Sequence, residues 1–459
     1  MTRTLDATHL VVGAGASGMA FTDALVDHDP TARVALVDRR EGPGGHWRAA
    51  YPFVRLHQAS QFYGVASTVL GGQRQTSGPE EGLFQRAGQP EIVAYYDAVL
   101  ARLAATGRVE TFFGADHVGG VGGEVVAATG ERYAVPAATR VVDARYLAPE
   151  VPSEVPPRFD VGDGVRVVPV NDLPREAPSA TRFVVVGSGK TATDAVVWLL
   201  GEGVDPGAVC WVRPREPWML DRARVQPDPA VFTAMTADLM TAAAVASDLG
   251  DLFARLEAAG VMLRLDPHHT PTMAKAPTLG RWERDLLATV DDVVRRGRVT
   301  AVRPGRLELD EGSVAVAADA LVVDCAADGL RNRPLVPIWG QDALTLQPIR
   351  AGFPCFGAAL AGYVEATRPG READEVKNAL CPPSPLGNTR ADYARMTLTG
   401  LGNAARFNAE PDVKAWADTV ALNPARVPPD HPGSPELDAA RERLAAAVGP
   451  ARANLERLV

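Results

Sequence analysis

The chain has 459 residues, of which 46% are hydrophobic and 22% are charged, and its formal net charge is -9 at pH 7. This length predicts two domains, or one domain interrupted by another, with a large core. The acidic balance argues against nucleic acid or an anionic membrane as a partner, because both are bound through clustered Lys and Arg.

The N-terminal residues show no signal-peptide cleavage site, and no apolar stretch approaches the length of a membrane span. We therefore expect a cytoplasmic protein without a membrane partner. The four cysteines, at positions 210, 325, 355 and 381, form neither a CxxC pair nor a metal-ligand spacing. We expect reduced, mostly buried thiols and no metal site.

Residues 9–38 carry the pattern of a dinucleotide-binding unit. An apolar run leads into a GxGxxG turn, a helical pattern follows, and a second apolar run ends in an aspartate. The first glycine permits a tight turn, the second lets the backbone approach a pyrophosphate, and the third lets helix and strand pack closely. The helix start offers free N–H groups to the phosphates, and the carboxylate can accept ribose hydroxyls. The residues expected to bind this dinucleotide are Gly13, Gly15, Ala16, Ser17, Gly18, Asp38 and Arg39.

A second copy of this unit lies at residues 181–203. An apolar run leads into GSGKTA, which starts at residue 187, and then into an amphipathic helical pattern. Alanine at the third position still allows close packing. A nucleoside triphosphate loop of the GxxxxGK[ST] type is excluded, because Val184 stands where its first glycine is required. The residues expected to contact the second dinucleotide are Gly187, Ser188, Gly189, Lys190, Thr191 and Ala192.

The strand after the second unit ends in two arginines, Arg213 and Arg215, where the first unit has Asp38. A carboxylate there would repel the 2′-phosphate of NADP, whereas a guanidinium can bind it through two hydrogen bonds. This difference favours NADPH over NADH. The alternative is that both arginines are solvated side chains at the end of a strand.

Two dinucleotide sites in one chain suggest a flavin and a nicotinamide that reduces it. The order of motifs resembles the two-dinucleotide-binding flavoproteins, and among them the class B flavin-dependent monooxygenases of the flavin-containing, Baeyer–Villiger and N-hydroxylating types. Residues 13–18 match the FAD site of that family, and residues 187–192 match its NADP site. The GGHW stretch at residues 44–47 is similar to the GGxW element that these enzymes place beside the flavin ring. The resemblance implies FAD and NADPH as cofactors.

The resemblance also implies an α/β fold with two Rossmann-like dinucleotide-binding domains. The FAD domain is expected to be discontinuous, with residues 1–160 and 331–459. The NADP domain is expected to span residues 161–330, with a helical insertion at about 219–260. We expect this insertion to be a packed helical cover, and a cover over the substrate entrance is the alternative.

Local patterns place further elements in the FAD domain. A helix is predicted at residues 91–107, followed by short alternating strands between residues 108 and 137. The resemblance implies that a backbone group near Val118 touches the adenine. A further helix is predicted to begin near Phe356, with its N-terminus toward the flavin.

The loop at residues 44–60 combines glycines, aromatic rings and hydrogen-bond donors, and it is expected to run along FAD toward its ring. A cation beside the ring would favour the anionic reduced flavin, and a histidine with the ordinary pKa of ~6.5 could serve as acid or base. The alternative is that these side chains only hold the loop and the cofactor in place. The expected cofactor contacts are Gly45, His46 and Trp47, and the expected catalytic residues are Arg55, His57 and Gln58.

These expectations predict an NADPH-dependent FAD monooxygenase that transfers one oxygen atom to a small-molecule substrate. The alternative is a flavin dehydrogenase or reductase that uses NAD(P)H without oxygen. Residues 159–174 favour that alternative, because they lack the histidine of the FxGxxxH fingerprint of flavin-containing monooxygenases. A non-catalytic binding protein is disfavoured by the two intact phosphate-binding turns.

Overall fold

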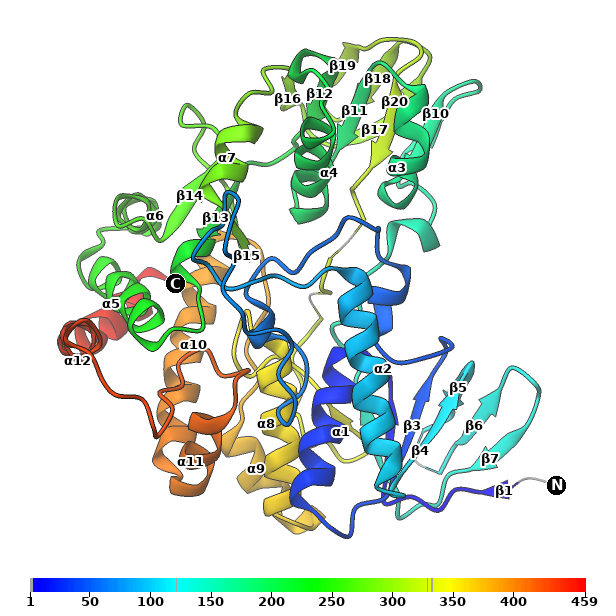
Figure 1. Ribbon diagram of the computed structural model, residues 1–459, viewed down its shortest axis with the longest axis vertical. Coiled ribbons are helices and arrows are strands. Elements are labelled where there is room, and N and C mark those ends of the chain that lie inside the picture. Colours follow the sequence, from blue (N-terminus) through cyan, green and yellow to red (C-terminus); the bar gives the residue numbers. More distant parts are fainter. Residues whose placement is uncertain (1–2, 121, 328, 332) are drawn as a thin grey trace.

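The computed structural model describes residues 3–120, 122–327, 329–331 and 333–459. Two parallel sheets with their helices lie at different ends of the molecule, and a further group of helices lies beside them (Figure 1). The predicted class, α/β with two Rossmann-like units, is confirmed.

The first parallel sheet has the strand order β21-β8-β2-β3-β4. Its strands are β2 (His9–Val12), β3 (Val34–Asp38), β4 (Val109–Phe113), β8 (Arg140–Asp143) and β21 (Leu344–Thr345). β2 and β3 are buried along their whole length, which explains why their sequences are continuous apolar runs. The helices that accompany this sheet are α1 (Ala16–His28), α2 (Gln89–Ala105) and α8 (Pro354–Thr367). α2 and α8 confirm two predicted helices, and both contact α1.

A small sheet with the order β1-β7-β6-β5 adjoins β3. Its strands are β1 (Arg3–Thr4), β5 (Ala115–Val118), β6 (Glu124–Ala127) and β7 (Arg132–Ala134). The antiparallel pairing of β5, β6 and β7 confirms the short strands predicted in this region.

The second parallel sheet has the order β10-β20-β11-β12-β16. Its strands are β10 (Arg166–Pro169), β11 (Phe183–Val186), β12 (Val209–Val212), β16 (Val293–Val294) and β20 (Leu321–Asp324). Helices α3 (Leu173–Glu176) and α4 (Lys190–Gly201) belong to this unit. A further sheet, ordered β19-β18-β17-β9, contains β9 (Asp160–Val161), β17 (Val299–Arg303), β18 (Arg306–Leu309) and β19 (Gly312–Ala315).

The segment between β12 and β16 adds helices and a three-stranded sheet, β14-β13-β15. Its elements are β13 (Pro217–Asp221), α5 (Pro229–Val245), α6 (Leu249–Ala258), β14 (Met262–Arg264), β15 (Met273–Leu279) and α7 (Arg281–Leu287). Aspartates cap the N-termini of α5 and α6. Asp228 and Asp248 each accept hydrogen bonds from two N–H groups of the first turn of their helix.

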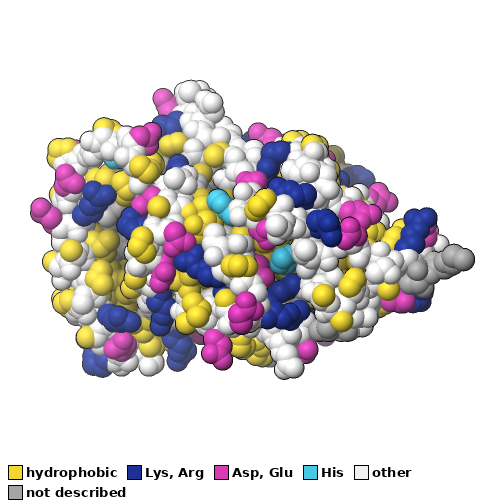
Figure 2. Space-filling view, turned by 90° about the horizontal axis from the view of Figure 1, so that it is seen from below, with side chains coloured by type: hydrophobic (Ala, Val, Ile, Leu, Met, Phe, Trp, Pro, Cys, Tyr) yellow, Lys and Arg dark blue, Asp and Glu magenta, His cyan; other side chains and the backbone are white. Residues whose placement is uncertain are grey.

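The C-terminal part is helical and returns to this segment. Its helices are α9 (Asp374–Leu380), α10 (Arg390–Ala409), α11 (Pro411–Thr419) and α12 (Pro435–Leu458). α12 packs along α5, and α10 contacts both α11 and α12, so helices far apart in sequence form one layer (Figure 1). Within the described ranges, no helix combines the length and apolarity needed to cross a membrane. On the face shown in Figure 2, basic and acidic side chains are interspersed.

Candidate active site

The first glycine turn joins β2 to α1 and is the expected phosphate site. Gly13 has a φ of +109°, and a Cβ at Gly18 would lie 1.8 Å from the carbonyl oxygen of Gly13. α1 begins after Gly15, which has no side chain to cap the helix, and its first turn carries no acidic residue. Its N–H groups and positive dipole end therefore fit a pyrophosphate. Ala16 and Ser17 are only partly buried there.

Asp38 ends β3, as predicted, and its side chain is buried. One carboxylate oxygen accepts a hydrogen bond from the N–H of Ala14 at 2.7 Å, and the other accepts one from the N–H of Arg40 at 2.8 Å. Each oxygen has a further lone pair, so binding of the ribose by this carboxylate stays a prediction. The contact of Val118 with adenine also stays a prediction; this residue ends β5 with an exposed side chain.

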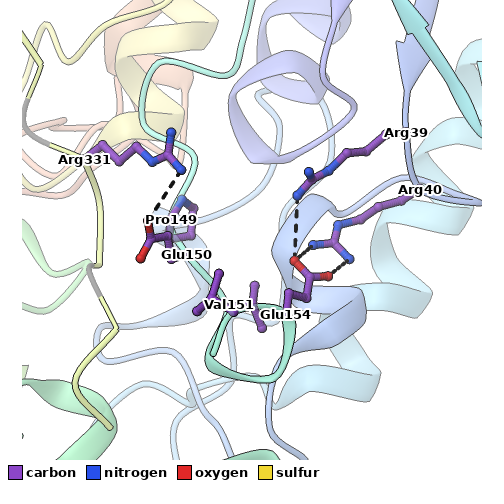
Figure 3. A pocket seen from close by; sticks show the side chains of 8 residues that line it. Arg39, Arg40, Pro149, Glu150, Val151, Glu154 and Arg331 are labelled. Carbon is purple, nitrogen blue, oxygen red and sulfur yellow. Dashed lines mark hydrogen bonds and ion pairs between the residues drawn. The ribbon is translucent and has the colours of Figure 1, made fainter. Parts of the chain in front are cut away.

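A polar cavity of about 430 Å³ lies beyond the end of β3. Figure 3 shows Arg39 and Arg40 turned toward Glu154. Arg40 lies 2.7 Å from the carboxylate of Glu154 and Arg39 lies 3.7 Å from it. A second pair in this cavity, Arg331 and Glu150, is 3.8 Å apart. Because Arg39 is largely exposed, it remains available to a ligand that enters beside the strand end.

The two glycines at the start of the loop 44–60 pack against the first glycine turn. The N–H of Gly44 donates to the carbonyl of Ala14 at 2.8 Å. A Cβ at Gly45 would lie 2.9 Å from the Cα of Gly15. The close approach of the two backbones explains the paired glycines, and it leaves a cradle beside the phosphate site that a side chain would fill.

Trp47 and His46 follow in the short 3₁₀ helix Gly45–Ala49. The indole N–H of Trp47 donates to the hydroxyl of Tyr63 at 2.5 Å, which fixes the ring. The ring of His46 lies 5.4 Å from that of Trp47. Burial, and then the charge of Arg40, lowers the pKa of His46 to about 4, so the ring is neutral at pH 7.

The three residues expected to carry the chemistry point in different directions. Val54 and Leu56 are buried, and Arg55 between them is exposed. Alternate residues of an extended segment face opposite sides, so Arg55 lies on the exposed side of this segment, and the position of its charge beside the flavin ring stays a prediction. Gln58 is buried and lines a large cavity. His57 lies between these two extremes and is half-buried.

The expectation that His57 has an ordinary pKa near neutrality is wrong. Burial, followed by the charges of Lys190, Arg222 and Arg86, lowers its pKa to about 3. Its Nδ1 accepts a hydrogen bond from the N–H of Thr278 at 3.3 Å, so a neutral ring carries its proton on Nε2. His57 can therefore position a group by a hydrogen bond, but it cannot supply a proton as an imidazolium at pH 7.

The second glycine turn leads into α4, which begins after Gly189. Like α1, this helix starts after a residue that has no capping side chain, so its N–H groups can bind a phosphate. The predicted contacts lie around this start: Gly187, Ser188 and Ala192 are buried, and Gly189, Lys190 and Thr191 are partly exposed.

Two residues that the sequence analysis missed connect this turn to the loop 44–60. Lys190 pairs with Asp194, one helical turn later. The hydroxyl of Tyr51 donates to the same carboxylate at 2.6 Å. The spacing of four residues between Lys190 and Asp194 could have indicated the pair, whereas nothing in the local sequence points to Tyr51.

The structure separates the two arginines expected at the 2′-phosphate. Arg213 is 4% exposed, lies over the ring of Trp211 at 4.5 Å and pairs with Glu216 at 3.1 Å. Within the described part of the chain, its Nε has no hydrogen-bond partner. Arg215 is exposed and donates to the side chain of Asn388 at 3.2 Å. Binding of NADPH by these residues stays a prediction.

A buried ionic cluster of Glu80, Arg86, Arg222 and Glu283 holds the segment after the loop 44–60 against the insertion. Arg222, 2% exposed, pairs with Glu80 and, at 2.7 Å, with Glu283. Its Nε also donates to the carbonyl of His57 at 2.9 Å. Arg86 lies 2.9 Å from Glu80. No local sequence pattern indicates this cluster, because its members come from three distant segments.

A second cavity, of about 590 Å³, opens beside Gln58. Most of its wall comes from apolar side chains of α5, α10 and α12. The loop that precedes α8, with Arg350 and Phe353, forms another part of the wall. α5 therefore borders a cavity large enough for a small molecule, and a role of the insertion as a cover over the substrate entrance stays a prediction.

Residues 11–58 match the family described as NAD(P)-binding Rossmann-like domain. The chain as a whole is similar to mycobacterial proteins. It is 41% identical over 426 residues to the uncharacterized protein Rv2000 of Mycobacterium tuberculosis, which covers 92% of this chain and 78% of the relative. The same values hold for the uncharacterized protein Mb2023 of Mycobacterium bovis.

The fold is similar to that of cyclohexanone monooxygenase. The open crystal structure of that enzyme matches 90% of this chain and 98% of its own, with a TM-score of 0.53 and 16% identity. The crystal structure of the enzyme from Rhodococcus sp. Phi1 bound to NADP⁺ matches 98% of both chains, with a TM-score of 0.51 and 16% identity. The resemblance to the fold of class B flavin monooxygenases is confirmed.

Proposed function

Because this chain belongs to the family of the mycobacterial protein Rv2000 and has the fold of a class B flavin monooxygenase, we propose that it is an NADPH-dependent FAD monooxygenase acting on a small molecule. One observation supports this proposal above the others: the loop 44–60 touches both glycine turns and the large cavity. Gly44 bonds to the first turn, Tyr51 bonds to Asp194 beside the second, and Gln58 lines the cavity. A reaction in which one dinucleotide reduces the other, and the reduced cofactor then activates oxygen beside a substrate, needs these three sites together.

FAD reduced by NADPH supplies the electrons that activate oxygen, so that one oxygen atom can pass to the substrate. The backbone N–H groups at the start of α1 would bind the pyrophosphate of FAD, and those at the start of α4 would bind that of NADPH. Trp47, fixed by Tyr63, would hold the ring region of the cofactor. Neutral His57 and Gln58 would position the reacting groups by hydrogen bonds, and α5 would exclude water from the cavity.

The use of oxygen is tested by following NADPH and oxygen together. We expect the FAD-loaded protein in air to consume about one O₂ per NADPH, because each reduced flavin supplies two electrons. A Gly18→Val variant is the control, because its side chain would collide with the carbonyl of Gly13 and should prevent FAD binding and oxidation. Oxidation of NADPH by an added electron acceptor without oxygen uptake would establish the dehydrogenase alternative instead.

The preference for NADPH is tested at the two arginines after β12. Replacing Arg213 and Arg215 together by methionine should raise the KM for NADPH about tenfold or more, because a hydrogen bond to a charged group contributes about 1.5–3 kcal/mol. The KM for NADH should change little. Arg182→Met is the matched control, since Arg182 precedes β11 at the opposite end of the same sheet. Equal use of both nucleotides by the unchanged protein would contradict this assignment.

A further inference from the structure

The large cavity is apolar over most of its wall, with an unbalanced cation on its inner side. It has a volume of about 590 Å³. The apolar side chains that line it include Phe232, Met235, Leu239, Tyr393, Phe407 and Leu444. Such a wall favours a ligand with a sizeable apolar body.

Arg350 brings the cation to this wall from the loop before α8. Its guanidinium lies 5.9 Å from the centre of the Phe232 ring, and its nearest polar partner is the amide oxygen of Asn423 at 3.5 Å. Among the described residues, no carboxylate pairs with it. Burial alone lowers the pKa of Arg350 to about 10, so it remains a cation at neutral pH. Arg350 is half-buried, and a cation that is partly removed from water without a counter-ion is unfavourable unless a ligand supplies the missing charge.

The other charged side chains of this cavity are already paired. Lys414 lies 2.5 Å from Asp418, and Arg441 lies 3.6 Å from Asp438. Lys414 and Arg441 are 52% and 49% exposed, which places them at the mouth. The positive charge of Arg350 therefore acts inside the cavity, while the charges at the mouth largely cancel.

Gln58 is a further polar side chain of the cavity wall, and it comes from the loop 44–60. It is 4% exposed, and its side-chain amide makes no hydrogen bond within the described part of the chain. A guanidinium and a free amide N–H are donors that together suit the two oxygens of a carboxylate.

We propose that the cavity binds an acid with an apolar body, and that Arg350 and Gln58 bind its carboxylate. This inference rests on the proposed function, because it names the class of molecule that enters the same active site. The apolar body lies along α5, α10 and α12, with the carboxylate on the Arg350 side. The substrate is thus an amphipathic organic acid rather than a neutral ketone or an amine.

Calorimetric titration of the FAD-loaded protein with decanoate, 1-decanol and decylamine tests this assignment. We expect decanoate to bind at least about tenfold more tightly than 1-decanol, because a charged hydrogen-bonded pair adds that much affinity, and decylamine to bind most weakly. Arg350→Met should remove the advantage of decanoate and leave the affinity for 1-decanol unchanged. Arg350→Lys should keep part of it, since lysine supplies the charge without the planar pair of donors.

Arg441→Met is the matched control, because it removes the same charge from the mouth of the same cavity and should leave decanoate binding unchanged. A thermal melt of ligand-free Arg350→Met should show an equal or higher Tm, because the variant no longer holds an unpaired, half-buried cation against an apolar wall. Equal affinities of decanoate and 1-decanol, unchanged decanoate binding in Arg350→Met, or release of FAD by that variant would overturn the proposal. Binding is measured without NADPH or oxygen, so a failure of the proposed reaction would be seen separately.

Discussion

Replacing Arg222 by methionine should lower the free energy of unfolding by about 3–5 kcal/mol, because two buried carboxylates, Glu80 and Glu283, then share Arg86 as their remaining cation. Arg222 is 2% exposed and contacts both Glu80 and Glu283. It also donates to the carbonyl of His57, so the loop 44–60 loses one hydrogen bond in the same variant, while Thr278 still bonds to His57. Urea unfolding followed by circular dichroism measures the effect.

Arg224→Met is the matched control for this prediction. Arg224 lies two residues further along the same 3₁₀ helix and pairs with Asp238, but its side chain is 28% exposed. A half-exposed pair contributes within about 1 kcal/mol, so this variant should unfold close to the unchanged protein. Adding Glu80→Gln and Glu283→Gln to Arg222→Met should recover part of the loss, because neutral amides no longer need the cation. If Arg222→Met and Arg224→Met lowered the free energy of unfolding by the same amount, the buried cluster would contribute no more to stability than the Arg224–Asp238 pair.

The parts of this fold that could be predicted from the sequence are those whose conformation is determined by residues within one short segment. Gly18 is needed because any Cβ would meet the carbonyl of Gly13, and this requirement belongs to a turn of six residues. The fully buried strands β2 and β11 are continuous apolar runs for a similar local reason. Both glycine turns, their strands and their helices were therefore predicted correctly.

The properties of individual side chains depend on distant segments, and there the prediction failed. The pKa of His57 is set by burial and by Lys190, Arg222 and Arg86, which come from three other segments. No window around residue 57 contains this information. The exposure of Arg55 depends on the pairing of its segment with residues 87 and 88, which a window around residue 55 does not contain either.

The large cavity could not be predicted from the sequence either, because its wall forms only when distant helices pack together. α5 and α12 are far apart in the sequence, yet they pack side by side and form part of the wall of this cavity. Hydrophobic patterning predicts that each helix has an apolar face, but it does not say which other face covers it. Arg350 can be recognised as a candidate ligand-binding residue only from the folded structure, in which it lines this cavity.

Acid should destabilise the folded chain from about pH 6.5 downward, well before most carboxylates are protonated. Burial lowers the pKa of His57 from 6.5 to about 3 and that of His46 from 6.5 to about 4. An unfolded chain binds protons at both histidines below pH 6.5, whereas the folded chain binds them only near pH 3 and 4. The unfolded state therefore takes up more protons in this window, and the free energy of unfolding falls as the pH falls.

Glu80 also lowers the free energy of unfolding as the pH falls, but at lower pH. It is an anion that becomes neutral on protonation, whereas the histidines become cations. Desolvation alone would raise its pKa, but Arg222 and Arg86 outweigh this effect and lower the pKa from 4.5 to about 2. Its contribution to stability is complete above pH 4.5 and is lost as the pH falls toward 2. The two histidines therefore contribute to the loss of stability between pH 6.5 and 4, and Glu80 contributes below pH 4.5.

Urea unfolding at pH 7, 6, 5 and 4 separates these contributions. We expect a loss of about 2 kcal/mol or more between pH 7 and 4, and His57→Asn should make that decrease shallower. Asparagine can still accept the hydrogen bond from Thr278 through its amide oxygen, so the variant changes the titration and keeps this contact. His268→Asn is the control, because His268 is exposed and its replacement should leave the pH dependence as it is. If His57→Asn followed the same steep curve as the unchanged protein, burial of a neutral imidazole beside three cations could not be the cause of the acid destabilisation.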